Sequence, residues 1–157
     1  MQKIFQNLYE ADKIIKAMDH LVYVTFPLVR DKRMLLKIIE ETKKAVVLCI
    51  NSILQFDYLY RKIRLYKSTE ENLRTFKEKC APRYGISPQE IGKITNLFEI
   101  AEKHKKSSME FVRKDKIVIV SNGFQTNTIT VEKTKEFVIL AKNILSKIEK
   151  TIKTNYS

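Results

Sequence analysis

The chain has 157 residues, enough for one domain to bury a core without disulfides or structural metals. Its composition, 44% hydrophobic and 31% charged, excludes a disordered chain, and only three glycines and three prolines disfavour a turn-rich sandwich or barrel. The net charge of +12 favours partners that carry negative charge. We therefore expect a single helical domain, residues 1–157, of the mainly α class.

The first predicted helix begins near Gln2 and reaches about Val24. Pro27 disfavours the helical conformation of the residue before it, so this helix is predicted to stop near Phe26. The apolar positions alternate steps of four and three, the spacing of a helix that packs along another helix. They are Ile4, Leu8, Ala11, Ile15, Met18 and Val22.

The second predicted helix is long, with Asp31 as its N-cap and an end near Arg64. The stretch from Ala45 to Leu59 is apolar on nearly every side, so we expect it to be the buried axis of the fold. Together with the first helix it forms a long antiparallel helix hairpin. Its four-and-three seam comprises Leu35, Ile39, Thr42, Val46, Cys49, Ile53, Phe56, Tyr60 and Ile63.

Two capping boxes predict the next helix starts. Ser68 with Glu71 begins a short helix that should end before Pro82, followed by a loop at Tyr84-Gly85. Ser87-Pro88-x-Glu90 combines an N-cap, a proline at the first helical position and a glutamate three residues after the serine. The buried stripe of the helix that follows is Ile91, Ile94, Phe98 and Ala101.

The pattern then changes to that of strands. Residues 116–121 are β-branched, Asn122-Gly123 is a turn signal, and residues 126–131 can return as a second strand. Thr130 is placed to cap a last helix. The predicted fold is a helical bundle built on the long helix hairpin, with one small β-hairpin before the C-terminal helix.

Motifs of common enzymes and metal sites are missing from the sequence. It contains no Gly-rich phosphate loop, no nucleophile elbow and no Cys/His metal spacing, so we expect no metal, no cofactor and no catalytic residue. Cys49 and Cys80 form no Cys-x-x-Cys motif and indicate a reducing, cytoplasmic setting. The N-terminus lacks the apolar stretch of a signal peptide, and no apolar run is long enough to span a bilayer, so no membrane is expected.

Two polar groups on the predicted helices are weaker candidates for chemistry. Asp19 and His20 pair a carboxylate with an imidazole, but adjacent helical residues point in different directions, which favours a structural role. Polar residues also interrupt the apolar second helix, where they either fix helix register or line a pocket in the core. The possible buried polar site comprises Asn51, Gln55, Asp57 and Arg61.

The densest basic segment spans residues 103–116, which carry a net charge of +4. A basic patch beside a helix end and a β-hairpin can bind phosphates, although lysine-rich loops are also common on surfaces that bind nothing. The candidate nucleic-acid-binding residues are Lys103, Lys105, Lys106, Arg113, Lys114 and Lys116.

Three functions are compatible with this sequence. The first is a non-enzymatic basic binding protein that contacts RNA, DNA or a ribonucleoprotein mainly through phosphates. The second is a helical interaction module that pairs with another copy of itself or with another helical protein. The third is an enzyme with a pocket in the bundle core, which has the least support because no catalytic motif accompanies the polar residues.

Overall fold

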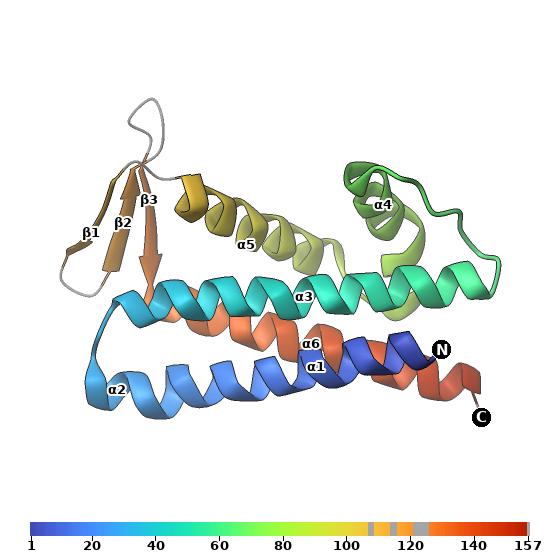
Figure 1. The fold of residues 1–157 in the computed structure, drawn as a ribbon, viewed down its shortest axis with the longest axis horizontal. Coiled ribbons are helices and arrows are strands. Elements are labelled where there is room, and N and C mark those ends of the chain that lie inside the picture. Colours follow the sequence, from blue (N-terminus) through green and yellow to red (C-terminus); the bar gives the residue numbers. More distant parts are fainter. Residues whose placement is uncertain (107–108, 114–115, 121–125, 157) are drawn as a thin grey trace.

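Three long helices lie side by side and form the body of the molecule in the computed structural model, which describes residues 1–106, 109–113, 116–120 and 126–156. They are α1 (Gln2–His20), α3 (Arg33–Leu59) and α6 (Val131–Tyr156) (Figure 1). A fourth helix, α5 (Pro88–Lys106), packs on α3 and α6, and a small sheet stands at one end of the bundle. The mainly α class is confirmed, and α1 and α3 form the expected antiparallel hairpin.

The first helix does not stop at Pro27, which corrects the sequence-based prediction. A π-helical turn, η1 (Leu21–Thr25), joins α1 to a short helix, α2 (Phe26–Val29). The Phe26 amide donates to the Leu21 carbonyl, five residues back, so the hydrogen-bond register has changed when the chain reaches Pro27. The proline then occupies the first turn of α2, where its missing N–H costs little, and Arg30 ends the helix with a φ of 55°.

Helix α3 is the central element, packing against α1, α5 and α6. The Asp31 carboxylate accepts from the Arg33 amide at 3.1 Å, but the N-cap of α3 is Lys32, so the predicted N-cap lies one residue too early. The predicted end at Arg64 is wrong, because α3 ends at Leu59 and Arg61 turns the chain with a φ of 58°. Tyr60 is consequently exposed rather than part of the buried seam.

The chain stays helical beyond the predicted end of the third helix. Helix α4 (Thr69–Thr75) has the expected N-cap, in which the Ser68 hydroxyl accepts from the Glu71 amide. A π turn, η2 (Phe76–Cys80), and a 3-10 turn, η3 (Ala81–Tyr84), follow it. Pro82 lies in the first turn of η3 and so does not interrupt it, and Tyr84, predicted as loop, is buried.

Helix α5 begins at the capping box that the sequence predicts. The Glu90 amide donates to the Ser87 hydroxyl at 3.1 Å, and the Glu90 carboxylate accepts from the Ser87 amide at 3.0 Å. Gly85, with a φ of 71°, makes the turn that precedes the box. On α5 the side chains of Ile94 and Ala101 are buried, whereas Ile91 and Phe98 are half-buried.

Along the chain, a three-stranded antiparallel sheet lies between α5 and α6. Its strands β1 (Met109–Arg113), β2 (Lys116–Val120) and β3 (Thr126–Thr130) lie in the order β1-β2-β3. The β2–β3 pair confirms the predicted hairpin, β1 was not predicted, and the Asn122-Gly123 turn lies outside the described residues. The Thr130 hydroxyl accepts from the Lys133 amide at 3.1 Å and caps α6 as expected.

Candidate functional site

The polar residues predicted to form one site on α3 lie in different environments. Asn51 is exposed, Gln55 is half-buried, Asp57 is buried, and Arg61 is exposed beyond the end of the helix. Asp57 alone among them is at the centre of a buried hydrogen-bond cluster.

The Asp57 cluster ties the end of α3 to η3. The Arg83 guanidinium forms an ion pair with Asp57 Oδ2, and the Tyr84 hydroxyl donates to Asp57 Oδ1 at 3.0 Å. Burial, with the nearby Asp57 charge, raises the pKa of Tyr84 far above its usual range, so the phenol stays protonated and donates. Burial and a hydrogen bond to Asp57 also raise the pKa of Cys80 to about 12.

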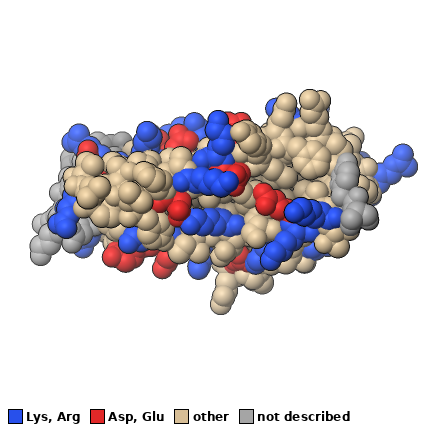
Figure 2. Space-filling model, turned by 90° about the horizontal axis from the view of Figure 1, so that it is seen from below, with Lys and Arg blue, Asp and Glu red and all other residues tan. Residues whose placement is uncertain are grey.

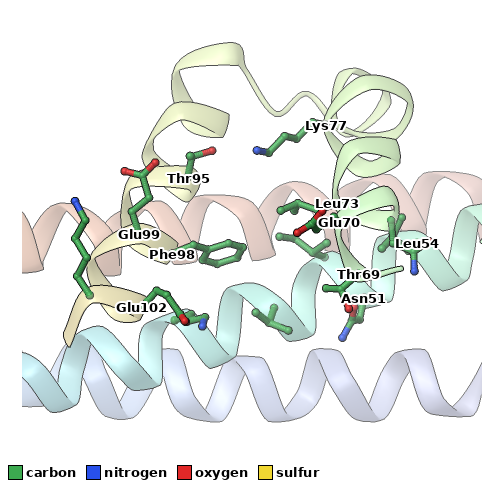
Figure 3. A pocket seen from close by; sticks show the side chains of 15 residues that line it. Asn51, Leu54, Thr69, Glu70, Leu73, Lys77, Thr95, Phe98, Glu99 and Glu102 are labelled. Atoms are coloured by element: carbon green, nitrogen blue, oxygen red, sulfur yellow. The ribbon is translucent and has the colours of Figure 1, made fainter. Parts of the chain in front are cut away.

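A groove of about 820 Å³ lies over α3, between α4 and α5 (Figure 3). Its floor is apolar and includes Ile50, Leu54, Leu73 and Phe98. Charged residues of both signs line it as well: three lysines and three glutamates. They are Lys43, Lys77, Lys103, Glu70, Glu99 and Glu102. This mixture gives the groove no net charge to attract a polyanion.

The candidate nucleic-acid-binding residues of the sequence are divided between two places. Lys103, Lys105 and Lys106 lie on the last turn of α5, whereas Arg113 of β1 and Lys116 of β2 are partners in the sheet register. Lys114 lies outside the described residues. Lys103 and Lys105 each line a cavity that also contains glutamates: Lys103 with Glu99 and Glu102, and Lys105 with Glu10 and Glu40.

Elsewhere many lysines are paired with carboxylates. Lys142 of α6 pairs with Asp19 of α1, and Lys16 pairs with Asp12 at 2.8 Å. Figure 2 shows that basic and acidic side chains alternate over the face seen there.

Tyr23 lies under two lysine ammonium groups, and the His20 ring contacts the Thr25 hydroxyl at 3.4 Å. The Asp19-His20 pair therefore has the structural surroundings that the sequence favoured.

A different surface combines cations with exposed aromatic rings. It is the segment from Tyr58 to Lys67, which we call the basic-aromatic segment, at the end of the bundle opposite the sheet. Tyr58, Tyr60 and Tyr66 expose 52%, 48% and 42% of their surface. The segment contains no Asp or Glu, and its cations are all exposed: Arg61, Lys62, Arg64 and Lys67.

Several contacts hold this segment in one conformation. Ile63 is buried and anchors its middle in the core. The Tyr60 ring packs on Phe56, with ring centroids 4.7 Å apart. The Asn72 side chain both accepts from the Tyr66 amide and donates to the Tyr66 carbonyl, each at 2.8 Å. These contacts fix the backbone while the tyrosine rings stay accessible, so a ligand would not have to order the segment.

The sequence-based prediction missed this segment because it extended α3 to Arg64. In that helix Tyr60 and Ile63 would both face the core. The signal that could have identified the segment is the alternation of aromatic and basic residues without any acid, Tyr-Leu-Tyr-Arg-Lys-Ile-Arg-Leu-Tyr-Lys.

No family profile matches this chain, and neither does any curated protein. Within the described residues, no helix has the length and apolar character needed to cross a membrane. No group of three or more His, Cys, Asp or Glu side chains in that part of the chain is arranged to hold a metal ion.

Proposed function

We propose that the protein binds single-stranded nucleic acid, without catalysis, through the basic-aromatic segment. The observation that carries this proposal is the combination of three exposed tyrosines and four exposed cations in ten residues free of carboxylates. Proteins that bind single strands use such a combination: cations contact the phosphates, and bases stack on aromatic rings.

The local charge supports a polyanion as the ligand. The segment carries +4, and the carboxylate that precedes it, Asp57, is engaged by Arg83 and Tyr84. Glu70 and Glu71 follow it in the first turn of α4, where the positive end of the helix dipole partly compensates them. In contrast, the lysines at the end of α5 share their cavities with glutamates.

The tyrosines support a single strand rather than a duplex. Bases in a duplex are stacked on one another, whereas unpaired bases are free to stack on side chains. Tyr66 is held through its own backbone by Asn72, so its ring is presented without support from a ligand. Binding through such contacts is expected to tolerate many sequences.

The experiment compares two variants that each remove three positive charges. One is Arg61→Gln/Lys62→Gln/Arg64→Gln, and its matched control at the other end of the bundle is Lys103→Gln/Lys105→Gln/Lys116→Gln. Fluorescence anisotropy with a labelled oligouridine measures Kd over a range of salt concentrations. We expect the wild type to show a log–log salt slope of about −3 if four phosphates are contacted, since each contributes about −0.7.

The segment variant should lose about two units of that slope and bind at least about tenfold more weakly, while the control variant retains both properties. Loss of binding in the control variant alone would move the site to the α5 end and contradict our assignment. Failure of the wild type to bind any oligonucleotide would overturn the function. Tighter binding to phosphatidylserine vesicles than to RNA, abolished in the segment variant, would identify a membrane-surface protein instead.

A second candidate function rests on the groove between α4 and α5. Its apolar floor and its rim of three lysines and three glutamates suit an amphipathic helix of a partner protein that carries both charges. A photo-crosslinking residue at Leu73 tests this idea, with one at exposed Ile139 of α6 as the control. The candidate is supported if a peptide made from the cross-linked partner binds the wild type but not Leu73→Arg. It is contradicted if Leu73 and Ile139 give the same adducts.

A further inference from the structure

A small polar cavity of about 230 Å³ adjoins the basic-aromatic segment. Most of its lining residues lie outside the segment, so the proposed strand binding gives them no role. It lies between the residues that follow α3, the 3-10 turn η3, and the last turns of α6. Lys62 belongs to both the segment and the cavity. The lining residues are Asp57, Lys62, Arg83, Tyr84, Thr151 and Asn155.

The Asp57 carboxylate does not make this cavity repel anions, because both of its oxygens are engaged. Oδ2 is paired with Arg83, and Oδ1 accepts from the Tyr84 hydroxyl at 3.0 Å. Asp57 is 2% exposed and fixes the orientation of the guanidinium, whose side chain is 35% exposed. An arginine oriented from behind by a carboxylate presents further N–H groups to a ligand in a fixed geometry.

The groups around the cavity together favour an anion. Lys62 and Arg83 contribute two positive charges against the one negative charge of Asp57, which leaves a local excess of +1. The Asn155 amide adds a neutral donor, whereas the Thr151 hydroxyl gives its proton to the Lys147 carbonyl at 2.8 Å and offers the cavity only a lone pair. A phosphate monoester has the charge and the number of acceptor oxygens that this set requires.

We propose that this cavity binds a phosphate monoester, and that its source is the terminal phosphate of a strand held on the basic-aromatic segment. The assignment of the source rests on the proposed function. The volume accommodates a phosphate group and several waters, since a water takes about 30 Å³. The ribose and base would then lie outside the cavity, next to Lys62, which lines the cavity and belongs to the segment.

Two measurements test the proposal separately from the function on which it rests. First, inorganic phosphate is titrated into the ¹⁵N-labelled protein while the Arg83 Nε–Hε resonance is followed, with chloride at equal ionic strength as the control. Second, anisotropy compares oligouridine with a 5′-phosphate, a 3′-phosphate or no terminal phosphate. We expect Arg83 to shift with phosphate and not with chloride, and one terminal phosphate to tighten binding about tenfold.

The variants avoid Arg83, whose removal would leave a buried carboxylate unpaired. Asn155→Ala lies at the exposed edge of the cavity and outside the segment, so it should remove most of the terminal-phosphate preference while binding of the unphosphorylated strand is retained. Lys150→Gln, on the same helix but outside the cavity lining, is the control and should keep the preference.

The proposal is overturned if inorganic phosphate does not shift the Arg83 resonance and the terminal phosphate makes no difference to binding of the oligonucleotides. It is overturned equally if phosphate does not shift that resonance and no oligonucleotide binds. If phosphate shifts Arg83 but no oligonucleotide binds, the phosphate site is supported. In that case the proposed nucleic-acid function fails, and the source of the phosphate is a free small molecule.

Discussion

The side-chain amide of Asn72 pairs with the backbone of Tyr66 through two hydrogen bonds, as a neighbouring strand would. Asn72 Oδ1 accepts from the Tyr66 N–H and Nδ2 donates to the Tyr66 carbonyl, both at 2.8 Å. Through these two hydrogen bonds, helix α4 holds the C-terminal end of the basic-aromatic segment. The relationship makes Asn72 a positioning residue for a surface that it does not itself form.

Asn72→Ala is therefore expected to weaken RNA binding severalfold although it changes no charge and no aromatic ring. The loss arises because the free segment must be ordered on binding. Urea denaturation should show a decrease of about 1 kcal/mol in the free energy of unfolding for the lost bonds. Asn51→Ala, an exposed asparagine on α3, is the control and should bind normally. Equal binding by Asn72→Ala and wild type would contradict this role.

Tyr66 is expected to contribute to binding through its ring rather than its hydroxyl. Tyr66→Ala should weaken binding of oligouridine by about 1–3 kcal/mol, the range found for one stacked base, whereas Tyr66→Phe should bind nearly as the wild type does. Tyr9→Ala, which removes a still more exposed ring from α1 (69% against 42% for Tyr66), serves as the control in the same anisotropy assay. A similar loss in Tyr9→Ala and Tyr66→Ala would show that the effect is not specific to the segment.

Thr42 offers a test of the core. Its hydroxyl is buried in α3 and has no hydrogen-bond partner in the part of the chain that the structure describes. Thr42→Val keeps the shape and removes the unpaired group, so we expect the free energy of unfolding to rise by about 1 kcal/mol. Thr134 is the matched contrast, since its hydroxyl donates to the Thr130 carbonyl at 2.8 Å, and Thr134→Val should be destabilising. Denaturant midpoints that move in the same direction would refute this interpretation.

Glu90 is expected to make stability depend on pH in the acid range. Partial burial by itself raises the pKa of this carboxyl, but the Lys147 ammonium and the Ser87 hydrogen bonds outweigh it and hold the pKa below its ordinary value. The stabilisation is therefore present above the ordinary carboxyl range and is lost as the pH falls through the lowered pKa. Thermal denaturation between neutral and acid pH should show a steeper decline for the wild type than for Glu90→Gln. Parallel curves would show that Glu90 does not contribute.

The two thiols should be unreactive in the folded protein. Burial raises the pKa of both Cys49 and Cys80 to about 12, and thiolates are the reactive species. At pH 8 the native protein is expected to react with a disulfide reagent only through opening of the structure, whereas both thiols react promptly in urea. Equal rates for native and unfolded protein would show that Cys49 and Cys80 are accessible.

The sequence was sufficient for the parts of the fold that depend on local periodicity and caps. The apolar seam of the first helix, the Ser87–Glu90 box and the Thr130 cap are all in place. The unpredicted helical turns at Pro27 and Pro82 have one physical cause. In each case a π turn precedes the proline, changes the hydrogen-bond register and lets the helix continue, and no local residue pattern indicates such a turn.

The candidate site was less accessible to sequence reasoning because its contacts join distant positions. The sequence shows Asp57 as a polar residue in an apolar helix, but its partners Arg83 and Tyr84 follow 26 and 27 residues later. The pairing of Asn72 with Tyr66 likewise depends on the turn at Arg61, where α3 has already ended. The alternation of tyrosines and cations in residues 58–67 is present in the sequence, but extending α3 to Arg64 concealed it.

The central claim, that the basic-aromatic segment binds a single strand, is tested most directly by mapping amide chemical shifts while oligouridine is titrated into the ¹⁵N-labelled protein. Our account predicts that the largest shifts fall on residues 58–67 and on Asn72, and that they diminish as salt is raised. Shifts concentrated at the end of α5 and on the sheet, or no shifts at all, would contradict it.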